Sequence, residues 1–338
     1  MTSDRRILAI GDVHGCYDGL VRLLRLGQLV DGRLRWTAPR RTHLMILGDM
    51  IDEGAESREV IHLIRSLEEQ APDRVHVLLG NHELLLLRAF SGDAAVLNFE
   101  SAWSWASTDP TLSEYLHAID MPRLSTDEIR SSFQQTYRET GYAQYPDKYD
   151  AAVRNVGVEA RRRVAELLRQ SLVEDGSLSW LLNLPAGAKI ADWVFFHGGP
   201  PAAFFGDMVD LNGTVRELLV AQAWRHELLE PYRSAKSPIG TRNWAPDEAT
   251  ADRYLQQYGV KHIAFGHSPG ALNGIFGRLC HRWGKIFKAD SYSSLGIEGY
   301  LEILDREVWA VYTENSQATF SYVHPGSRLA KCELLWDH

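Results

Sequence analysis

Apolar positions in the first ninety residues alternate between short continuous runs and helix-like spacing. Runs at residues 7–10, 43–47 and 75–79 have the length and composition of buried β-strands. Apolar residues at helical spacing follow the first two runs, over residues 20–26 and 57–67. Repeated succession of strand, polar loop and helix is typical of an α/β fold whose sheets are covered by helices.

The pattern changes in the middle of the chain and then returns. Residues 91–185 are rich in Trp, Ser, Tyr and charged residues, and 154–172 has the spacing of a helix. Strand-like runs return at 193–196 and 262–265, and several short strands are expected over 286–322. We therefore predict a single domain over all 338 residues, with a helical, cap-like insertion.

Composition narrows the class of protein. The chain is 45% hydrophobic and 24% charged, which is ordinary for a globular protein. A formal net charge of -8 argues against a nucleic-acid partner, since such proteins need a basic surface. The three cysteines form no CxxC pair, which argues against a disulfide framework. No apolar stretch is long enough to cross a bilayer and no signal peptide is evident, so we expect a cytoplasmic protein without a membrane partner.

Polar side chains follow five of the apolar runs, each next to a glycine. Sites in open α/β sheets form at the carboxyl ends of strands, where these side chains stand. A single aspartate there often caps a helix, and a single histidine often only bonds a loop. Recurrence at five strand ends is hard to attribute to chance, and Asp, Asn and His donors without thiolates suit Mn²⁺, Fe or Zn²⁺. The side chains are Asp12, His14, Asp49, Asp52, Asn81, His82, His197 and His267.

The motifs that contain these residues resemble those of a known family. They are GDVHG (11–15), GDMIDEG (48–54), GNHE (80–83), HGG (197–199) and GHSP (266–269). This set resembles the calcineurin-like metallophosphoesterases. Its order and spacing are most similar to the phosphoprotein phosphatase branch and, within it, to the bacterial Shewanella-like protein phosphatases. The resemblance implies a four-layer β-sandwich flanked by helices.

The resemblance also implies a role for each residue. His82 would be the general acid that protonates the leaving oxygen, and Asp52 would orient it. The nucleophile would be a hydroxide that bridges two divalent metal ions, with Mn²⁺ favoured and Fe or Zn²⁺ as alternatives. The implied ligands are Asp12 and His14 for the first metal, Asp49 as the bridge, and Asn81, His197 and His267 for the second.

The second motif departs from the family at one position. The family usually has Asp-Arg-Gly where this chain has Asp52-Glu53-Gly54, and that arginine normally binds the substrate phosphate. Glu53 reverses the charge, so either it turns away to pair with a basic residue or the substrate is held differently. Arg242 and Arg225 are candidates for the missing phosphate contact, and the surrounding sequence favours Arg242.

Three functions are compatible with this pattern. The first is a protein phosphatase for phosphoserine, phosphothreonine or phosphotyrosine. The second is a hydrolase of small phosphorylated molecules such as diadenosine tetraphosphate, and aromatic residues in the 91–185 insertion would suit base stacking unless they pack its own core. The third is a pseudophosphatase that binds a phosphoprotein without turnover, which Glu53 alone supports.

Overall fold

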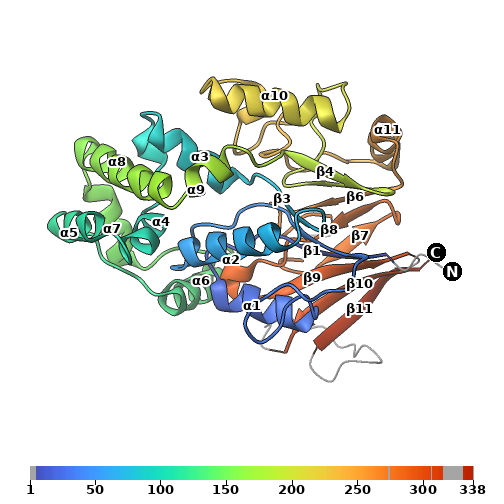
Figure 1. The fold of residues 1–338 in the computed structure, drawn as a ribbon, viewed down its shortest axis with the longest axis horizontal. Coiled ribbons are helices and arrows are strands. Elements are labelled where there is room, and N and C mark those ends of the chain that lie inside the picture. The colour runs from blue at the N-terminus through green and yellow to red at the C-terminus, as the bar shows by residue number, and fades with distance from the viewer. Residues whose placement is uncertain (1–4, 273–274, 306, 315–329, 338) are drawn as a thin grey trace.

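The computed structural model describes residues 5–272, 275–305, 307–314 and 330–337, which form two β-sheets with helices on both sides (Figure 1). In the first sheet the strand order is β11-β10-β9-β1-β2-β3, and in the second it is β4-β5-β6-β8-β7. The first sheet contains β1 (Arg6–Ile10), β2 (Thr42–Ile46), β3 (Val75–Val77), β9 (Gly299–Leu304), β10 (Glu307–Thr313) and β11 (Ala330–Asp337). The second contains β4 (Gly187–Ile190), β5 (Trp193–Phe196), β6 (His262–Phe265), β7 (Cys280–Arg282) and β8 (Ile286–Lys288).

Side-chain alternation along the strands explains why the sheets pack on each other. Successive residues of a strand point to opposite faces. Ile7 and Ala9 of β1 therefore join the core between the sheets, whereas Leu8 and Ile10 join the larger core on the outer face. The core between the sheets also takes side chains from both sheets, including Met45, Leu47, Phe195, Ala264, Phe287 and Leu301.

Helices cover the outer faces and complete the four layers. The first sheet is covered by α1 (Tyr17–Leu26) and α2 (Ser57–Gln70), and α10 (Met208–Val220) and α11 (Glu248–Tyr258) lie beside the second (Figure 1). In α1 the buried side chains recur at helical spacing, with Leu20, Leu23 and Leu24 among them. This architecture confirms the predicted α/β sandwich flanked by helices.

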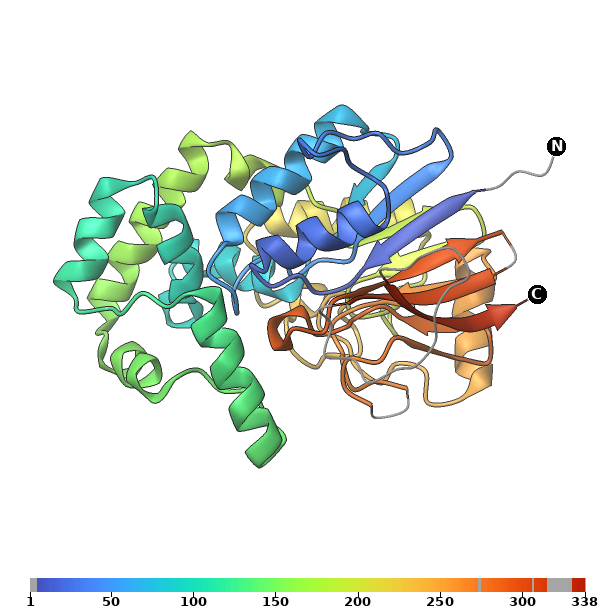
Figure 2. The same cartoon turned by 90° about the horizontal axis from the view of Figure 1, so that it is seen from below.

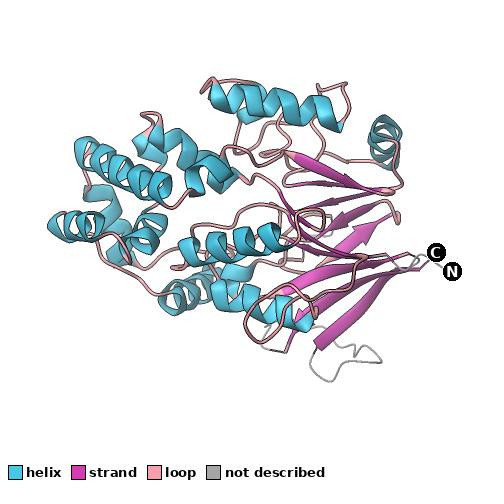
Figure 3. Ribbon diagram, viewed as in Figure 1, coloured by secondary structure: helices cyan, strands magenta, loops and turns pink. Residues whose placement is uncertain are grey.

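A mainly helical segment separates the third and fourth strands. It follows α3 (Asn81–Phe90) and projects to one side of the sheets (Figures 2 and 3). Its helices are η1 (Ala94–Val96), α4 (Phe99–Ala106), α5 (Pro110–Ala118), α6 (Thr126–Thr140), α7 (Asp147–Asn155), α8 (Val158–Glu174) and α9 (Ser177–Leu181). The single helix expected over 154–172 is instead the end of α7 and most of α8, because Gly157 has an extended backbone (φ -67°, ψ 161°) and caps α8.

The rest of the chain adds short elements. Two 3₁₀ turns, η2 (Glu227–Leu229) and η3 (Ser293–Leu295), lie in the connections of the second half. The strands expected after residue 286 are β8, β9 and β10, and the part of that prediction over 315–322 lies outside the described residues. None of the helices in the described part of the chain is both long and apolar enough to cross a membrane.

Candidate metal centre

The polar strand ends meet at one edge of the two sheets. Strands β1 and β2 run parallel, as do β5 and β6, so the loops that follow them leave at the same end. The backbone N–H groups of Val13 and His14 both donate to the carbonyl oxygen of Asp49, at 2.9 Å each, and join the first two loops. A Cβ on Gly15 (φ 57°) would lie 2.6 Å from the Gly54 carbonyl oxygen, which explains why a glycine follows His14.

Several side chains at this edge extend from backbone in the left-handed region. His14, Asp49, Asp52 and His267 have φ values of 50°, 47°, 65° and 59°. Such conformations cost of order 1 kcal/mol or more for residues other than glycine, and they persist where the surroundings enforce them. Their concentration in these loops indicates that the fold places the four side chains at the expense of local backbone energy.

A first group of donor atoms consists of Asp12, His14 and Asp49, all buried and mutually within 4.8 Å. Nε2 of His14 lies 3.9 Å from Asp12 Oδ2 and 3.9 Å from Asp49 Oδ2. Nδ1 of the same ring donates to the carbonyl oxygen of Ile51 at 3.1 Å. Because Nδ1 is used in that bond, Nε2 is the ring nitrogen that faces the two carboxylates, the arrangement found in histidines that bind a metal through one nitrogen and a backbone carbonyl through the other.

A second group shares Asp49 and adds His197 and His267. Nδ1 of His197 donates to the Leu47 carbonyl oxygen at 2.8 Å, while its Nε2 lies 3.0 Å from Asn81 Oδ1 and 3.4 Å from Asp49 Oδ2. A ring nitrogen and two side-chain oxygens therefore meet at this point. Nε2 of His267 is also buried, without a hydrogen-bond partner among the described residues. A cation bound between these atoms would satisfy all of them.

The electrostatics of the cluster also fit bound cations. Burial raises the pKa of Asp12 well above its ordinary value, and the Asp290 and Asp49 carboxylates raise it further. Burial, then the neighbouring His197 and Arg242, lower the pKa of His267, so this ring stays neutral, as a metal ligand must. The donors are oxygens and imidazole nitrogens without thiolate, which suits divalent ions such as Mn²⁺, Fe²⁺ or Zn²⁺.

His82 lies beside the first group and is held by Asp52. Its Nδ1 is 2.8 Å from Asp52 Oδ2, and its backbone N–H donates to Asp49 Oδ1 at 2.9 Å. Burial opposes protonation of this ring, but the Asp49 carboxylate and the hydrogen bond to Asp52 raise the pKa of His82 to about 10. A ring with this pKa is protonated at neutral pH. Because Asp52 accepts the hydrogen bond from Nδ1, the N–H group at Nε2 is the one that can donate to another group.

Two residues of the helical segment complete this pair, and the motifs gave no sign of them. Asn98 Nδ2 donates to Asp52 Oδ2 at 2.7 Å, and Ser101 Oγ donates to Asp52 Oδ1 at 2.5 Å. Neither residue lies in a motif, so only the folded structure brings them to Asp52.

Glu83 is a second feature that sequence reasoning missed. Its fully buried carboxylate accepts from the backbone N–H groups of Asp49, Met50 and Gly80, at 3.0, 2.8 and 2.9 Å. It thereby ties the loop after β2 to the start of α3. The position of Glu83 at the end of the GNHE motif could have predicted this role, because a glutamate at the third position of a helix often accepts hydrogen bonds from backbone N–H groups at the helix N-terminus.

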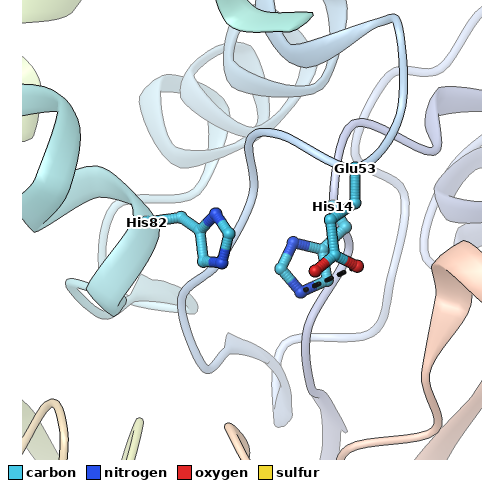
Figure 4. A group of neighbouring side chains, drawn as sticks. All are labelled: His14, Glu53 and His82. Atoms are coloured by element: carbon cyan, nitrogen blue, oxygen red, sulfur yellow. Dashed lines mark ion pairs between the residues drawn. The ribbon is translucent and has the colours of Figure 1, made fainter. Parts of the chain in front are cut away.

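Glu53 faces the site instead of turning away from it (Figure 4). Its Oε2 lies 3.7 Å from His14 Nε2 and accepts a hydrogen bond from Ser294 Oγ at 2.6 Å. Donor atoms of His14, Glu53 and His82 all lie within 4.8 Å of one another. Among the described residues, His14 is the one basic side chain that forms an ion pair with Glu53.

The structure separates the two candidate arginines. Arg242 Nη1 donates to the His267 carbonyl oxygen at 2.5 Å and to Ser268 Oγ at 3.1 Å, next to the second donor group. Its pKa is lowered by burial, against the opposing effect of Asp12. Arg225 is exposed on the turn after α10, and no described contact links it to the cluster.

Aromatic side chains from three segments pack together, and one of them, Tyr292, interacts with the charge of Glu53. The rings of Tyr292 and Phe276 are 5.4 Å apart, and those of Phe276 and Tyr137 are 5.0 Å apart. Tyr292 lies near Glu53 and Asp12, since burial and then the charges of Glu53, Asp290 and Asp12 all raise its pKa. We call Tyr137, Phe276 and Tyr292 the aromatic rim.

Comparisons with known proteins identify the family of the chain. A solved structure with a similar fold is a cold-active protein-tyrosine phosphatase of a psychrophilic Shewanella sp., 21% identical, with a TM-score of 0.57 over 90% of this chain and 77% of that chain. Symmetrical bis(5'-nucleosyl)-tetraphosphatases of Klebsiella pneumoniae and Cronobacter sakazakii are each 42% identical over 83 residues. That match spans 25% of this chain and 25% of each relative. The family model of the calcineurin-like phosphoesterases matches residues 5–271 of this chain. The chain therefore belongs to this family.

Proposed function

We propose that this protein is a metal-dependent phosphoester hydrolase that acts on phosphoproteins, at phosphoserine, phosphothreonine or phosphotyrosine. The observation that carries the proposal is the His82–Asp52 pair, a histidine held by a carboxylate beside two groups of metal-donor atoms. In the proposed site Asp12, His14 and Asp49 hold one divalent ion. Asp49, Asn81, His197 and His267 hold the other, and Mn²⁺ is our first choice.

Two bound metals would supply an activated water and would neutralise charge on the phosphate oxygens. The protein supplies the proton and the orientation. Because Nδ1 of His82 is engaged by Asp52, Nε2–H is the group that can protonate the leaving oxygen, and the charge on Asp52 stabilises the protonated ring. Arg242, beside the second donor group, is the arginine positioned to bind a phosphate oxygen.

The burial of two tryptophans in the helical segment argues against base stacking on them. Trp103 and Trp105 are only 4% and 1% exposed, so they pack inside the segment and offer no face to a nucleobase. We accordingly regard residues 91–185 as an insertion within one domain that caps the site and holds Asp52. The hypothesis that nucleobases stack on these tryptophans, which favoured a nucleotide substrate, is therefore weakened.

A dinucleoside polyphosphate hydrolase is the alternative. It is supported by the 42% identity over 83 residues to symmetrical bis(5'-nucleosyl)-tetraphosphatases. The aromatic rim adds to it, because Phe276 is 36% exposed and could stack on a base.

A substrate panel tests the proposal. The purified protein, loaded with Mn²⁺, would be assayed with phosphoserine, phosphothreonine and phosphotyrosine peptides, p-nitrophenyl phosphate and diadenosine tetraphosphate. We expect the highest kcat/KM on a phosphopeptide. Faster cleavage of diadenosine tetraphosphate would select the alternative. No turnover of any substrate by metal-loaded protein would exclude both, and would favour a binding role.

A further inference from the structure

Nε2 of His14 has three carboxylate groups at nearly equal distances from it. Oε2 of Glu53 lies 3.7 Å from Nε2, and the nearest oxygens of Asp12 and Asp49 lie 3.9 Å from it. Two donors that share one ion, each about 2.1 Å from it, stand about 3 to 4 Å apart. Glu53 is thus as close to this nitrogen as the two aspartates are, but it lies on the side of His82, since His14, Glu53 and His82 form one donor group and Asp12, His14 and Asp49 form another.

The surroundings hold Glu53 in this position. Its backbone has a φ of 55°, in the left-handed region, so its orientation is imposed on it. Ser294, which is 1% exposed, donates the hydrogen bond that fixes Oε2 and leaves the other carboxylate oxygen free of any bond that the structure records. Ser294 belongs to η3, which packs against α6 of the helical segment. The carboxylate is thus aimed inward by the tertiary structure (Figure 4).

A second observation comes from Asp290, a buried carboxylate whose charge acts on Asp12. Asp290 is 1% exposed, and its Oδ2 has no hydrogen-bond partner among the described residues. Burial raises the pKa of Asp290, while the charges of Lys288, His14 and Arg242 act in the opposite direction. The space around Asp12 and His14 therefore holds more carboxylate than the motif ligands provide, as expected of a pocket built for a strongly bound cation.

We propose that Glu53 is an additional donor to the first metal ion, in the place where a phosphate-binding arginine is expected. The inference rests on the proposed function, since it concerns the same metal centre. It accounts for an acidic side chain at a position that would otherwise repel an anionic substrate. It also makes the first position richer in oxygen, which favours Mn²⁺ over Zn²⁺ there, and it leaves Arg242 as the phosphate-binding arginine.

Metal titration tests this without reference to turnover. The full-length protein, stripped with a chelator, would be titrated with MnCl₂ by calorimetry, and bound Mn²⁺ would be examined by electron paramagnetic resonance. We expect two Mn²⁺ per wild-type chain. Glu53→Gln should weaken one binding step by about tenfold or more and change the Mn²⁺ spectrum, while Glu53→Asp should restore part of the affinity.

Glu56→Gln is the matched control. It removes the same charge three residues later, but the Glu56 carboxylate accepts from Thr126 Oγ1 at 3.0 Å instead of facing His14. Its Mn²⁺ affinities and spectrum should equal those of wild type.

The outcomes separate this inference from the proposed function. If Glu53→Gln binds two Mn²⁺ with wild-type affinity and spectrum, Glu53 is not a metal donor, while the hydrolase proposal stands. If Glu53→Arg keeps both ions and binds inorganic phosphate more tightly, Glu53 acts on the substrate instead, which also overturns the inference. A folded wild-type protein that binds no Mn²⁺ would overturn the proposed function itself.

Discussion

Ser101 Oγ donates a hydrogen bond to Oδ1 of Asp52 over 2.5 Å, although 49 residues separate the two in sequence. The bond connects α4 of the helical segment to the loop that follows β2. Because Oδ2 of the same carboxylate lies 2.8 Å from His82 Nδ1, Ser101 helps to set the orientation of the proposed proton donor. The helical segment therefore contributes directly to the position of Asp52.

Ser101→Ala tests this connection. A hydrogen bond to a charged group contributes about 1.5–3 kcal/mol, which corresponds to roughly a tenfold or larger loss of turnover if the energy is needed to orient His82. We expect a lower kcat with unchanged Mn²⁺ affinity. Ser107→Ala is the control, since Ser107 Oγ donates to the Ser104 carbonyl oxygen and not to Asp52. Wild-type turnover in Ser101→Ala would contradict the connection.

His82→Gln separates proton donation from metal binding. General acid catalysis typically contributes about 10²–10⁴-fold, so kcat should fall by that order on substrates with a poor leaving group. The loss should be smaller on p-nitrophenyl phosphate, whose leaving group needs less help from a proton. Mn²⁺ stoichiometry, measured by elemental analysis, should stay at the wild-type value. Loss of an ion in this variant would show that His82 is a ligand instead.

Asp52→Asn should change the pH dependence of turnover. The acid form of His82 is the active form, and the hydrogen bond and charge of Asp52 raise the pKa of His82. Turnover is therefore retained up to the pKa of the ring and lost as the pH rises through it. Removing the charge lowers this pKa, so the alkaline limb of kcat should move to lower pH.

Asp18→Asn, on the exposed side of α1, is the control for that measurement and should leave the profile unchanged. An alkaline limb that stays in place in Asp52→Asn would mean that another group controls it.

Arg242→Lys should weaken substrate binding. Lysine keeps the charge but loses the planar fork that matches a phosphate, so we expect KM and the inhibition constant for inorganic phosphate to rise by about tenfold. The Arg225→Lys variant is the comparison, because Arg225 is exposed and away from the cluster. Equal effects of the two substitutions would remove Arg242 from the phosphate site.

Features of this protein that depend on local pattern could be predicted from the amino-acid sequence. Short apolar runs predicted strands β1, β2, β5 and β6. Successive residues of a strand point to opposite faces, so a strand that is buried on both faces must be apolar at every position. The polar residues after them could be assigned to a common site, because parallel strands deliver their carboxyl ends to the same edge. The structure brings Asp12, His14, Asp49, Asn81, His197 and His267 together there.

Features that depend on contacts between distant segments became apparent only in the folded protein. The direction of Glu53 is set by Ser294, 241 residues later, and Asp52 is held by Ser101 from the helical segment. The choice of Arg242 over Arg225 likewise follows from the packing of Arg242 against the loop of His267. Local sequence pattern shows which strand ends are polar. The orientation of a side chain depends on the hydrogen bonds that it forms after the chain has packed. The residues that accept or donate those hydrogen bonds lie in segments that no local pattern connects.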